Sequence, residues 1–237
     1  MKYFYDTYSM LGTRKNNQDS YAVCEGANGF AAIVADGLGG YKGGELASKL
    51  CIEQFETAFE QNTEFDIEQA LLGANEIILD AQQQLENQMK TTAAAVRINS
   101  EDTFIANIGD SRVYAFKDGG IVFQSIDHSV AQMCVDSGEI TFDQIREHED
   151  RCILTRSLGA KIYAGIDVYC LENDEYDSLL LCSDGFWENV LEQEMCECLK
   201  QSQTPQQWLE KMRECRENRV GHDNDNNTAV VIMTGEE

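Results

Sequence analysis

The apolar positions of this chain follow two periods, one typical of strands and one typical of helices. Residues 20–25 (SYAVCE) and 30–35 (FAAIVA) are short apolar runs separated by glycine and asparagine, which predicts a β-hairpin. The second run is apolar at every position. A strand with two apolar faces lies between two layers, so we expect residues 30–35 in the interior of the protein.

Helical spacing follows this hairpin. From Leu46 to Phe59, and again from Ile67 to Leu85, apolar residues recur every three or four positions, which predicts two amphipathic helices. Asp66 is the candidate N-cap of the second helix, because a glutamine stands three residues later. Each helix has one apolar face and is therefore expected to cover an apolar surface.

The period returns to two between Thr92 and Ser125. Three or four short strands, separated by Asn-Ser, Gly-Asp and Asp-Gly-Gly turns, predict an antiparallel meander. Strands are also expected at 166–171, 178–182 and 228–233. Before the last of them we expect a helix with Thr204 as its N-cap and Pro205 as its first residue. Strand and helix do not alternate regularly, so the order predicts an α+β fold with helices on the outer faces of antiparallel sheets.

No segment marks a domain boundary. The 237 residues include one proline, no low-complexity stretch and no Gly/Ser linker longer than a turn. A hydrophobic share of 43% is sufficient for a sizeable core in a chain of this length. We therefore expect residues 1–237 to form a single domain, with the polar segment 128–150 as a surface excursion.

Charge and cysteine content limit the classes of function. The chain has 42 acidic and 18 basic residues and a formal net charge of −24, which repels nucleic acids and anionic lipids. Its first residues lack the apolar run of a signal peptide, and every apolar run is too short to cross a bilayer. The nine scattered cysteines indicate reduced thiols. We expect a cytoplasmic protein with no nucleic-acid or membrane partner.

Three aspartates stand where an apolar strand meets a turn. Asp36 follows FAAIVA, Asp184 follows LLLCS, and Asp225 precedes TAVVIM. Each one alone is typical of ordinary turn chemistry. If the three strand ends converge, however, the carboxylates repel one another unless a cation compensates. With no histidine or cysteine directly adjacent, their oxygens favour Mg²⁺ or Mn²⁺ over Zn²⁺, and Gly37 and Gly39 allow a close approach of the backbone.

A basic residue near the start of the chain is a second candidate. Arg14 lies in GTRKNNQDS, residues 12–20. A single arginine in such a segment is usually a solvated surface residue. Beside a metal site, its planar guanidinium is suited to bind two oxygens of one phosphate. Arg14 is therefore either a phosphate clamp or a surface residue.

Eight motifs in order resemble those of one enzyme family. They are GTRKNNQDS, VADGLGGYKGGELAS, TTAAAV, ANIGDSRVY, DHS, LTRSLG, LLLCSDGFWENV and DNDNNTAVVI. They are similar to the successive motifs of the metal-dependent type 2C serine/threonine protein phosphatases, the PPM family, above all its compact bacterial members. The resemblance extends from about residue 8 to residue 233. It implies a β-sandwich of two antiparallel sheets flanked by helix layers.

The resemblance also implies roles for individual residues. Asp36 would bridge two metal ions, Mn²⁺ or Mg²⁺, and the Gly37 carbonyl would bind the first of them. Asp184 and Asp225 would complete the site of the second ion. Asp19 would hold a water that is bound to metal.

Further positions match motifs of the same family. Asp127, together with Asp184, matches the residues that hold a third, weaker metal in bacterial relatives. Arg14 matches the phosphate-binding arginine. Asp110 lies in the GDSR motif, which we interpret as mainly architectural. Residues 129–150 match a mobile flap beside the active site.

Two positions depart from the family's pattern. Position 18 is glutamine where many members carry glutamate, so a negative charge near the metals is lost. Position 38 is leucine where animal members carry a histidine proposed as general acid, so the leaving group must take its proton from water or elsewhere. His128 and His148 lie in polar segments, where a histidine is usually only solvated.

The sequence thus predicts a phosphoprotein phosphatase. A water bridging two metal ions would attack phosphorus in line, while Arg14 and the metals take up charge on the phosphoryl oxygens. The expected partners are phosphorylated proteins, and the family suggests an opposing Ser/Thr kinase. The alternative is a metal-binding pseudophosphatase that recognises phosphoproteins without turnover, favoured by Gln18 and Leu38. A metal-dependent nuclease is a weaker third hypothesis, because the acidic charge opposes it.

Overall fold

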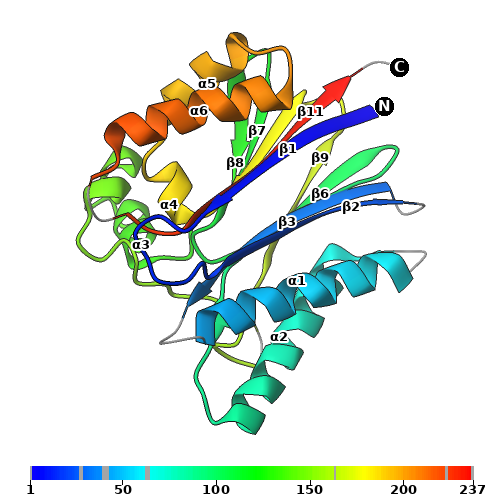
Figure 1. Ribbon diagram of the computed structural model, residues 1–237, viewed down its shortest axis with the longest axis vertical. Helices are drawn as coiled ribbons and strands as arrows, with labels where there is room; N and C mark the ends of the chain where they lie inside the picture. The colour runs from blue at the N-terminus through cyan, green and yellow to red at the C-terminus, as the bar shows by residue number, and fades with distance from the viewer. Residues whose placement is uncertain are drawn as a thin grey trace.

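Two antiparallel sheets lie face to face at the centre of the molecule (Figure 1). The structure is a computed structural model that describes residues 2–26, 29–38, 43–61, 65–162, 164–221 and 224–235. Gly39, which was expected at a close backbone approach, lies outside these ranges. The first sheet has the order β1-β11-β10-β7-β8, with strands β1 (Lys2–Met10), β7 (Arg112–Lys117), β8 (Gly120–Gln124), β10 (Ser178–Cys182) and β11 (Asn227–Gly235).

The second sheet contains the predicted hairpin. Its order is β2-β3-β5-β6-β9, and a short strand, β4, pairs with the end of β3. The strands are β2 (Asp19–Gly26), β3 (Gly29–Leu38), β4 (Lys90–Thr91), β5 (Ala93–Ile98), β6 (Asp102–Ile108) and β9 (Asp167–Glu172). The hairpin prediction is thus confirmed for its described residues.

Strand β3 is buried on both faces, as its sequence predicted. Ala32 and Val34 belong to the apolar layer between the two sheets. Ala31 and Ile33 point the other way and belong to the layer between their sheet and the helices. This strand therefore separates two hydrophobic layers of the core and carries Asp36, near its end, into a fixed position.

Helices cover the outer face of each sheet (Figure 1). On the second sheet lie α1 (Gly43–Gln61) and α2 (Ile67–Leu85), and on the first lie α5 (Glu192–Lys200) and α6 (Pro205–Arg219). The two predicted caps are confirmed: Asp66 accepts hydrogen bonds from the first turn of α2, and Thr204 accepts one from Gln207 N–H in α6. Among the described residues, no helix has the length and apolarity needed to span a bilayer.

The predicted meander is divided between the two sheets, which corrects the sequence prediction. Strands β5 and β6 pair in the second sheet, whereas β7 and β8 pair in the first. The chain changes sheets between Ile108 and Arg112, where Gly109 has a φ of 99° that favours glycine. This crossing places Asp110 at the ends of both sheets rather than in a hairpin turn.

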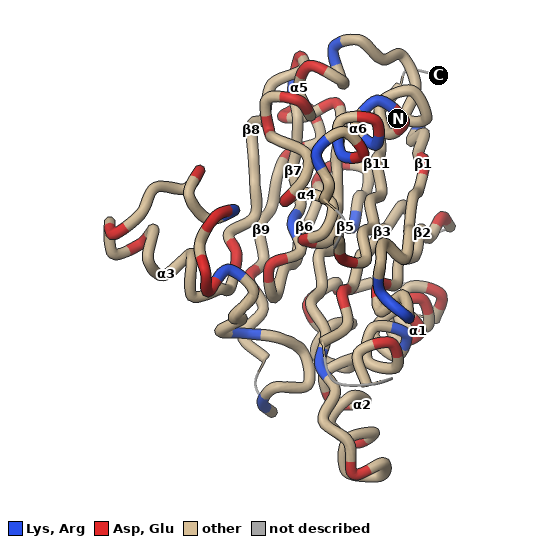
Figure 2. Tube along the Cα trace, turned by 60° about the vertical axis from the view of Figure 1, so that its left-hand side comes forward, with Lys and Arg blue, Asp and Glu red and all other residues tan. Residues whose placement is uncertain are grey.

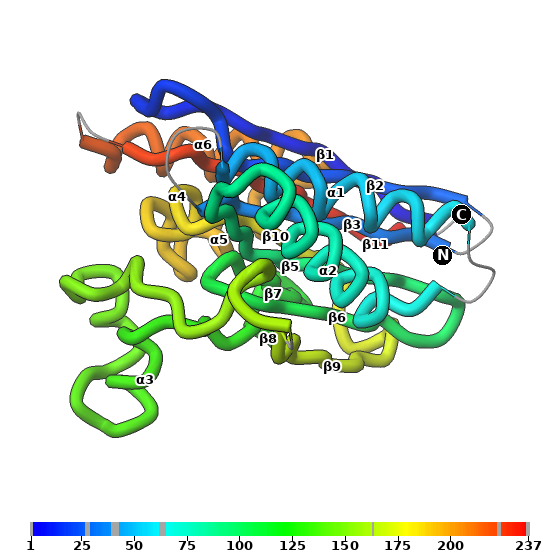
Figure 3. The backbone as a smooth tube through the Cα atoms, turned by 90° about the horizontal axis from the view of Figure 1, so that it is seen from below, coloured from blue at the N-terminus to red at the C-terminus, as the bar shows by residue number. Residues whose placement is uncertain are grey.

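Three short helical segments lie near the same end of the sandwich. They are α3 (Val130–Asp136), the 3₁₀ helix η1 (Phe142–Glu147) and α4 (Asp184–Trp187). Seen from below, the segment around α3 stands away from the two sheets (Figure 3). The polar segment 128–150 is therefore a surface excursion, as predicted, but it contains regular helical turns.

Candidate metal centre

The strand ends that carry the predicted aspartates converge on one cleft. Asp36 lies near the end of β3, Asp184 lies two residues after the end of β10, and Asp225 lies two residues before the start of β11. All three line an open cleft of about 440 Å³. Further lining residues include Arg14, Gln18, Gly37, Leu38, Asp110 and Cys152. The expected convergence of the three carboxylates is thus observed.

Backbone hydrogen bonds fix Asp36 at this position. Its N–H donates to Thr92 Oγ1 at 2.9 Å, and its carbonyl accepts from Thr92 N–H at 2.8 Å. The next residue must be glycine, because a Cβ at Gly37 would collide with the carbonyl oxygen of Gly44. The side chain of Asp36 is left to face the cleft, and Gly37 lines the cleft beside it.

A second close approach positions Asp184. A Cβ at Gly185 would collide with the carbonyl oxygen of Asn226, so glycine lets α4 lie against the segment that carries Asp225. The Gly185 N–H donates to Asp184 Oδ1 at 2.6 Å. The "apolar strand, Asp, Gly" pattern therefore has a packing reason at both of its occurrences.

Asp19 lies beneath the cleft rather than in its lining. It is directly opposite Asp36 in the register of β2 and β3, and it is only 7% exposed. Ser183 Oγ donates to Asp19 Oδ2 at 2.8 Å. The other oxygen, Oδ1, is buried and has no hydrogen-bond partner among the described residues. A buried carboxylate oxygen without a donor is costly unless a cation or water satisfies it.

The electrostatics of the cluster show strong mutual repulsion. Burial, followed by the charges of Asp19 and Asp184, raises the pKa of Asp36 well above its usual range. Burial, followed by the charges of Glu188 and Asp225, raises the pKa of Asp184 to about 7. Burial also raises the pKa of Asp19 to about 6. Each carboxyl resists ionisation first because it is buried and second because its neighbours are acids, and a divalent cation stabilises the ionised form in such an environment.

These residues fit a hard divalent cation. Asp36, Asp184 and Asp225 supply carboxylate oxygens, Gly37 lines the same cleft, and Asp19 adds a buried oxygen without a donor. Oxygen-rich sets of this kind suit Mg²⁺ and Mn²⁺. The surrounding charge attracts cations in general, since acidic residues outnumber basic ones on α1 and α2 and around α3 (Figure 2).

Arg14 reaches the cleft from the segment after β1. Its Nε donates to Asp225 Oδ1 at 2.9 Å and its Nη2 to Asp225 Oδ2 at 2.7 Å. Hydrogen bonds between Thr13 and Asn224 hold the two segments side by side. The residue thus combines features of both interpretations of the sequence, because its side chain is 52% exposed and also lines the cleft.

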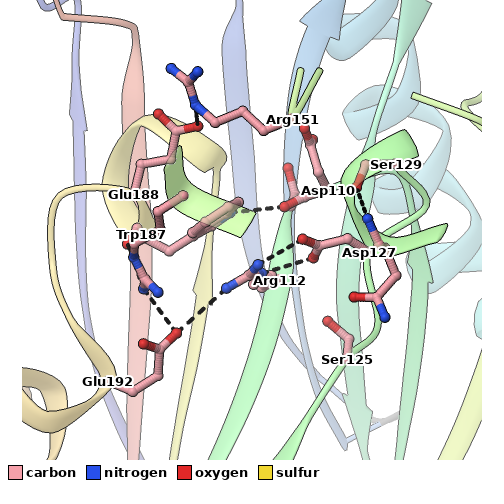
Figure 4. Close-up of polar contacts among 12 residues, drawn as sticks. Asp110, Arg112, Ser125, Asp127, Ser129, Arg151, Trp187, Glu188 and Glu192 are labelled. Atoms are coloured by element: carbon pink, nitrogen blue, oxygen red, sulfur yellow. Dashed lines mark hydrogen bonds and ion pairs between the residues drawn. The ribbon is translucent and has the colours of Figure 1, made fainter. Parts of the chain in front are cut away.

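The structure does not bring Asp127 to the cleft. Both of its oxygens accept from Arg112, at 2.8 Å from Nε and 2.6 Å from Nη2, in a pair with almost no exposure (Figure 4). The Arg112 guanidinium also stacks on Trp187, 3.4 Å from the ring centroid. Trp187 Nε1 donates to the Asp110 carbonyl at 2.9 Å. This buried cluster supports the crossing between the sheets.

Asp110, which we interpreted from the sequence as mainly architectural, is also an acidic residue of the cleft. It is 5% exposed and lines the cleft, and burial together with Asp184 and Asp127 raises its pKa well above the usual range. The available signal was its position at the end of an apolar strand, which is the same feature that identified Asp36. The Gly-Asp turn was instead interpreted as part of a meander.

The two residues that depart from the family's pattern, at positions 18 and 38, both lie at the cleft. Leu38 and Gln18 both line it, and the backbone carbonyl of Gln18 accepts from Gly37 N–H at 3.1 Å. Neither His128 nor His148 is among the residues found to line it. His128 accepts from Gly109 N–H at 3.2 Å and lies 3.1 Å from Asp167, which is a structural arrangement.

Comparison with known proteins agrees with this geometry. The Protein phosphatase 2C family profile matches residues 8–220. The serine/threonine phosphatase stp of Listeria monocytogenes is 33% identical over 202 residues, which cover 81% of this chain and 80% of that protein. Serine/threonine phosphatase Stp1 from Staphylococcus aureus has a similar crystal structure, with a TM-score of 0.88 at 25% identity over 100% of this chain and 96% of that one.

A solved relative contains metal. The catalytic domain of the serine threonine protein phosphatase PstP, in complex with two manganese ions, has a TM-score of 0.84 at 27% identity over 99% of each chain. These proteins share the two antiparallel sheets with flanking helices, so the α+β sandwich expected from the sequence is confirmed. The chain belongs to the protein phosphatase 2C family.

Proposed function

We propose that the protein hydrolyses phosphoserine and phosphothreonine in other proteins with the help of bound divalent metal ions. The observation that supports this most is the convergence of Asp36, Asp184 and Asp225 on one cleft with Arg14 at the same place. The related phosphatases named above agree with it, and they give no support to a pseudophosphatase. Residues 1–237 would act as a single catalytic domain.

We assign two metal ions, Mn²⁺ or Mg²⁺, to Asp36, Gly37, Asp184 and Asp225, with Asp19 close by. When bound, such ions acidify a water molecule and neutralise charge on phosphoryl oxygens. For a third, weaker ion we replace Asp127 by Asp110, because Asp110 lines the cleft while both oxygens of Asp127 are engaged by Arg112.

The protein's own groups bind and orient the substrate. The Arg14 guanidinium has the fork geometry that grips two phosphoryl oxygens, and its exposure lets it turn from Asp225 toward a phosphate. Leu38 in the cleft lining carries no proton to donate. The open cleft admits water, so we assign protonation of the leaving alkoxide to solvent.

The biological setting is also a proposal. Phosphoproteins are the substrate class, and an opposing Ser/Thr kinase would supply them. We place the protein in the cytoplasm because all nine cysteines are free, including Cys198 and Cys215, whose sulfur atoms are 3.8 Å apart.

A substrate panel tests this function. The protein with Mn²⁺ would be given phosphothreonine, phosphoserine and phosphotyrosine peptides, p-nitrophenyl phosphate and single-stranded DNA, and released phosphate or cut DNA would be measured. We expect turnover of the phosphothreonine and phosphoserine peptides and an intact DNA strand. Peptide binding without phosphate release would instead identify a pseudophosphatase, and DNA cleavage would identify a nuclease.

A further inference from the structure

A buried arginine on α6 contacts the metal centre from outside the cleft. Arg216 is 4% exposed and is not among the residues found to line the cleft. It continues the buried face of α6, four residues after Met212 and eight after Trp208. In Figure 1 the C-terminal end of α6 lies next to α4. The helical period predicts an apolar residue at this position, so a guanidinium buried here needs specific polar partners.

The guanidinium of Arg216 joins the two segments that carry Asp184 and Asp225. Its Nε donates to the Gly185 carbonyl at 3.0 Å, and its Nη2 donates to Asn224 Oδ1 at 3.4 Å. Gly185 directly follows Asp184, and Asn224 directly precedes Asp225. One side chain therefore holds the residues that adjoin two of the proposed metal ligands.

The Gly185 carbonyl depends on side-chain donors. In a longer helix it would accept from the N–H of Asn189, but α4 is short and that N–H donates to the Phe186 carbonyl at 3.1 Å. Arg216 Nε, at 3.0 Å, and Asn189 Nδ2, at 3.3 Å, bind the Gly185 carbonyl instead. Loss of the shorter bond would loosen α4, which begins at Asp184.

Asn224 extends the same connection to the phosphate clamp. Its carbonyl accepts from the N–H and the Oγ1 of Thr13, both at 3.0 Å, and Thr13 directly precedes Arg14. The segment before Asp225 is thus held from two sides, by Thr13 and by Arg216. The Asp225 side chain can then exchange Arg14 for a cation while its backbone stays in place.

The position of Arg216, rather than its charge, acts on the ligands. Within the described part of the chain, no acid forms an ion pair with it. Burial lowers the pKa of Arg216, and the groups that oppose this shift are Tyr8 and Glu217, neither of which lines the cleft. Its influence on the cleft therefore comes from the planar fork, which reaches two segments at once.

We propose that Arg216 is a positioning residue, which bonds Gly185 and Asn224 and so holds Asp184 and Asp225 in place for a shared metal ion. This inference rests on the proposed function, because that function assigns metal ions to the two aspartates. Arg216 does not line the cleft and is not a catalytic residue. Hydrogen bonds that orient metal ligands commonly change metal affinity by about 10–100-fold, because the ligands no longer have to be ordered when the ion binds.

A substitution that preserves the packing separates this role from a purely structural one. Arg216→Met keeps an unbranched side chain on the buried face of α6 and removes both hydrogen bonds, so the metal-free protein should keep a similar melting temperature. Calorimetric titration of the metal-free full chain should show a Kd for Mn²⁺ at least about tenfold weaker than that of wild type. Arg216→Lys keeps the charge without the fork, and its Kd should lie between the two.

The matched control is Arg219→Met, one turn further along the same helix. Arg219 donates to the Asn189 carbonyl and to Glu194, and it contacts neither Gly185 nor Asn224. Its Kd for Mn²⁺ should stay within about twofold of wild type. A structural role for Arg216 would show the opposite pattern, a lower melting temperature of the metal-free protein with an unchanged Kd.

Kinetics at saturating Mn²⁺ give a second readout. Because Arg216 touches no substrate, kcat and KM of Arg216→Met for a phosphothreonine peptide should return to within about threefold of wild type. A Kd for Mn²⁺ within about twofold of wild type would overturn the proposal, with Arg216→Lys deciding if Arg216→Met does not fold. A kcat that saturating Mn²⁺ does not restore would also overturn it. If Arg216→Met weakens Mn²⁺ binding but wild type releases no phosphate, the positioning role stands and the proposed function fails.

Discussion

Arg14 and Asp225 form a bidentate ion pair, with Nη2 and Oδ2 2.7 Å apart. Both carboxylate oxygens of a proposed metal ligand are thus occupied by the proposed phosphate clamp. The side chains are 52% and 45% exposed, so solvent screens the pair and it can exchange partners. Metal at Asp225 and phosphate at Arg14 each favour separation of the same pair, which links the two binding events.

Replacement of Arg14 should therefore affect both substrate and metal. Without the guanidinium fork, Arg14→Ala should raise KM for a phosphothreonine peptide with a smaller loss in kcat, and Arg14→Lys should fall between it and wild type. Calorimetric titration with Mn²⁺ should show equal or up to about fivefold tighter binding in Arg14→Ala, the scale of an exposed ion pair. If kcat/KM of Arg14→Ala stays within about twofold of wild type, Arg14 is a solvated surface residue and not a phosphate clamp.

Asp36→Asn should abolish turnover while leaving the protein folded. The substitution removes one negative charge from a site where Asp19, Asp184 and Asp110 repel it. The metal-free variant should then melt at the same or a higher temperature than metal-free wild type, and Mn²⁺ should raise its melting temperature less. Circular dichroism melts with and without Mn²⁺ measure both effects. An unfolded variant would mean that Asp36 has a structural role instead.

The metal-free protein should lose stability as pH rises from about 4 to about 7. Burial raises the pKa of Asp19 to about 6 and of Asp184 to about 7, and unfolding returns both to near 4. Over this window the folded state binds protons that the unfolded state releases, so the free energy of unfolding falls with rising pH. Urea unfolding in EDTA, compared with Asp184→Asn, isolates this contribution. A wild-type slope no steeper than that of Asp184→Asn would contradict it.

Asp127 and Asp110 should respond differently to the same change. Asp127→Asn leaves the buried Arg112 charge without its bidentate partner and with only Glu192, 3.5 Å away, as an acidic neighbour, so we expect a loss of about 3–5 kcal/mol in the free energy of unfolding. Asp110→Asn should keep the fold and alter Mn²⁺ dependence, because its carboxylate forms no ion pair within the described part of the chain. Urea unfolding and Mn²⁺ titration of activity measure the two variants. Loss of Mn²⁺ dependence without destabilisation in Asp127→Asn would restore the role predicted from the sequence.

Local sequence signals were sufficient to predict most of the helices and strands. Three predictions that depend only on neighbouring residues are confirmed. They are the burial of Ala32 and Val34, the N-cap at Asp66 and the proline at the start of α6. Strand β1 was missed because it alternates weakly. Its conformation depends on pairing with β11, where Lys2 is opposite Gly235 at the other end of the chain.

The site shows the same limit. Strand ends predicted that Asp36, Asp184 and Asp225 converge, because each end is marked by its own residues. Which of Asp110 and Asp127 lines the cleft depends on tertiary contacts. Arg112 forms an ion pair with Asp127, and the chain crossing at Gly109 directs Asp110 to the cleft. The alternation of apolar and polar residues is the same whether consecutive strands share one sheet or belong to two. The sequence pattern therefore could not distinguish a single meander from a chain that crosses between sheets.

The dependence of catalysis on the carboxylate-bound metals is the central claim. It is tested most directly by phosphate release from a phosphothreonine peptide before exhaustive EDTA treatment, after it, and after restoring Mn²⁺ or Mg²⁺. We expect activity to disappear with chelation and to return with either ion in wild type, and to remain absent in Asp36→Asn under all three conditions. Full turnover after complete removal of metal would contradict the account.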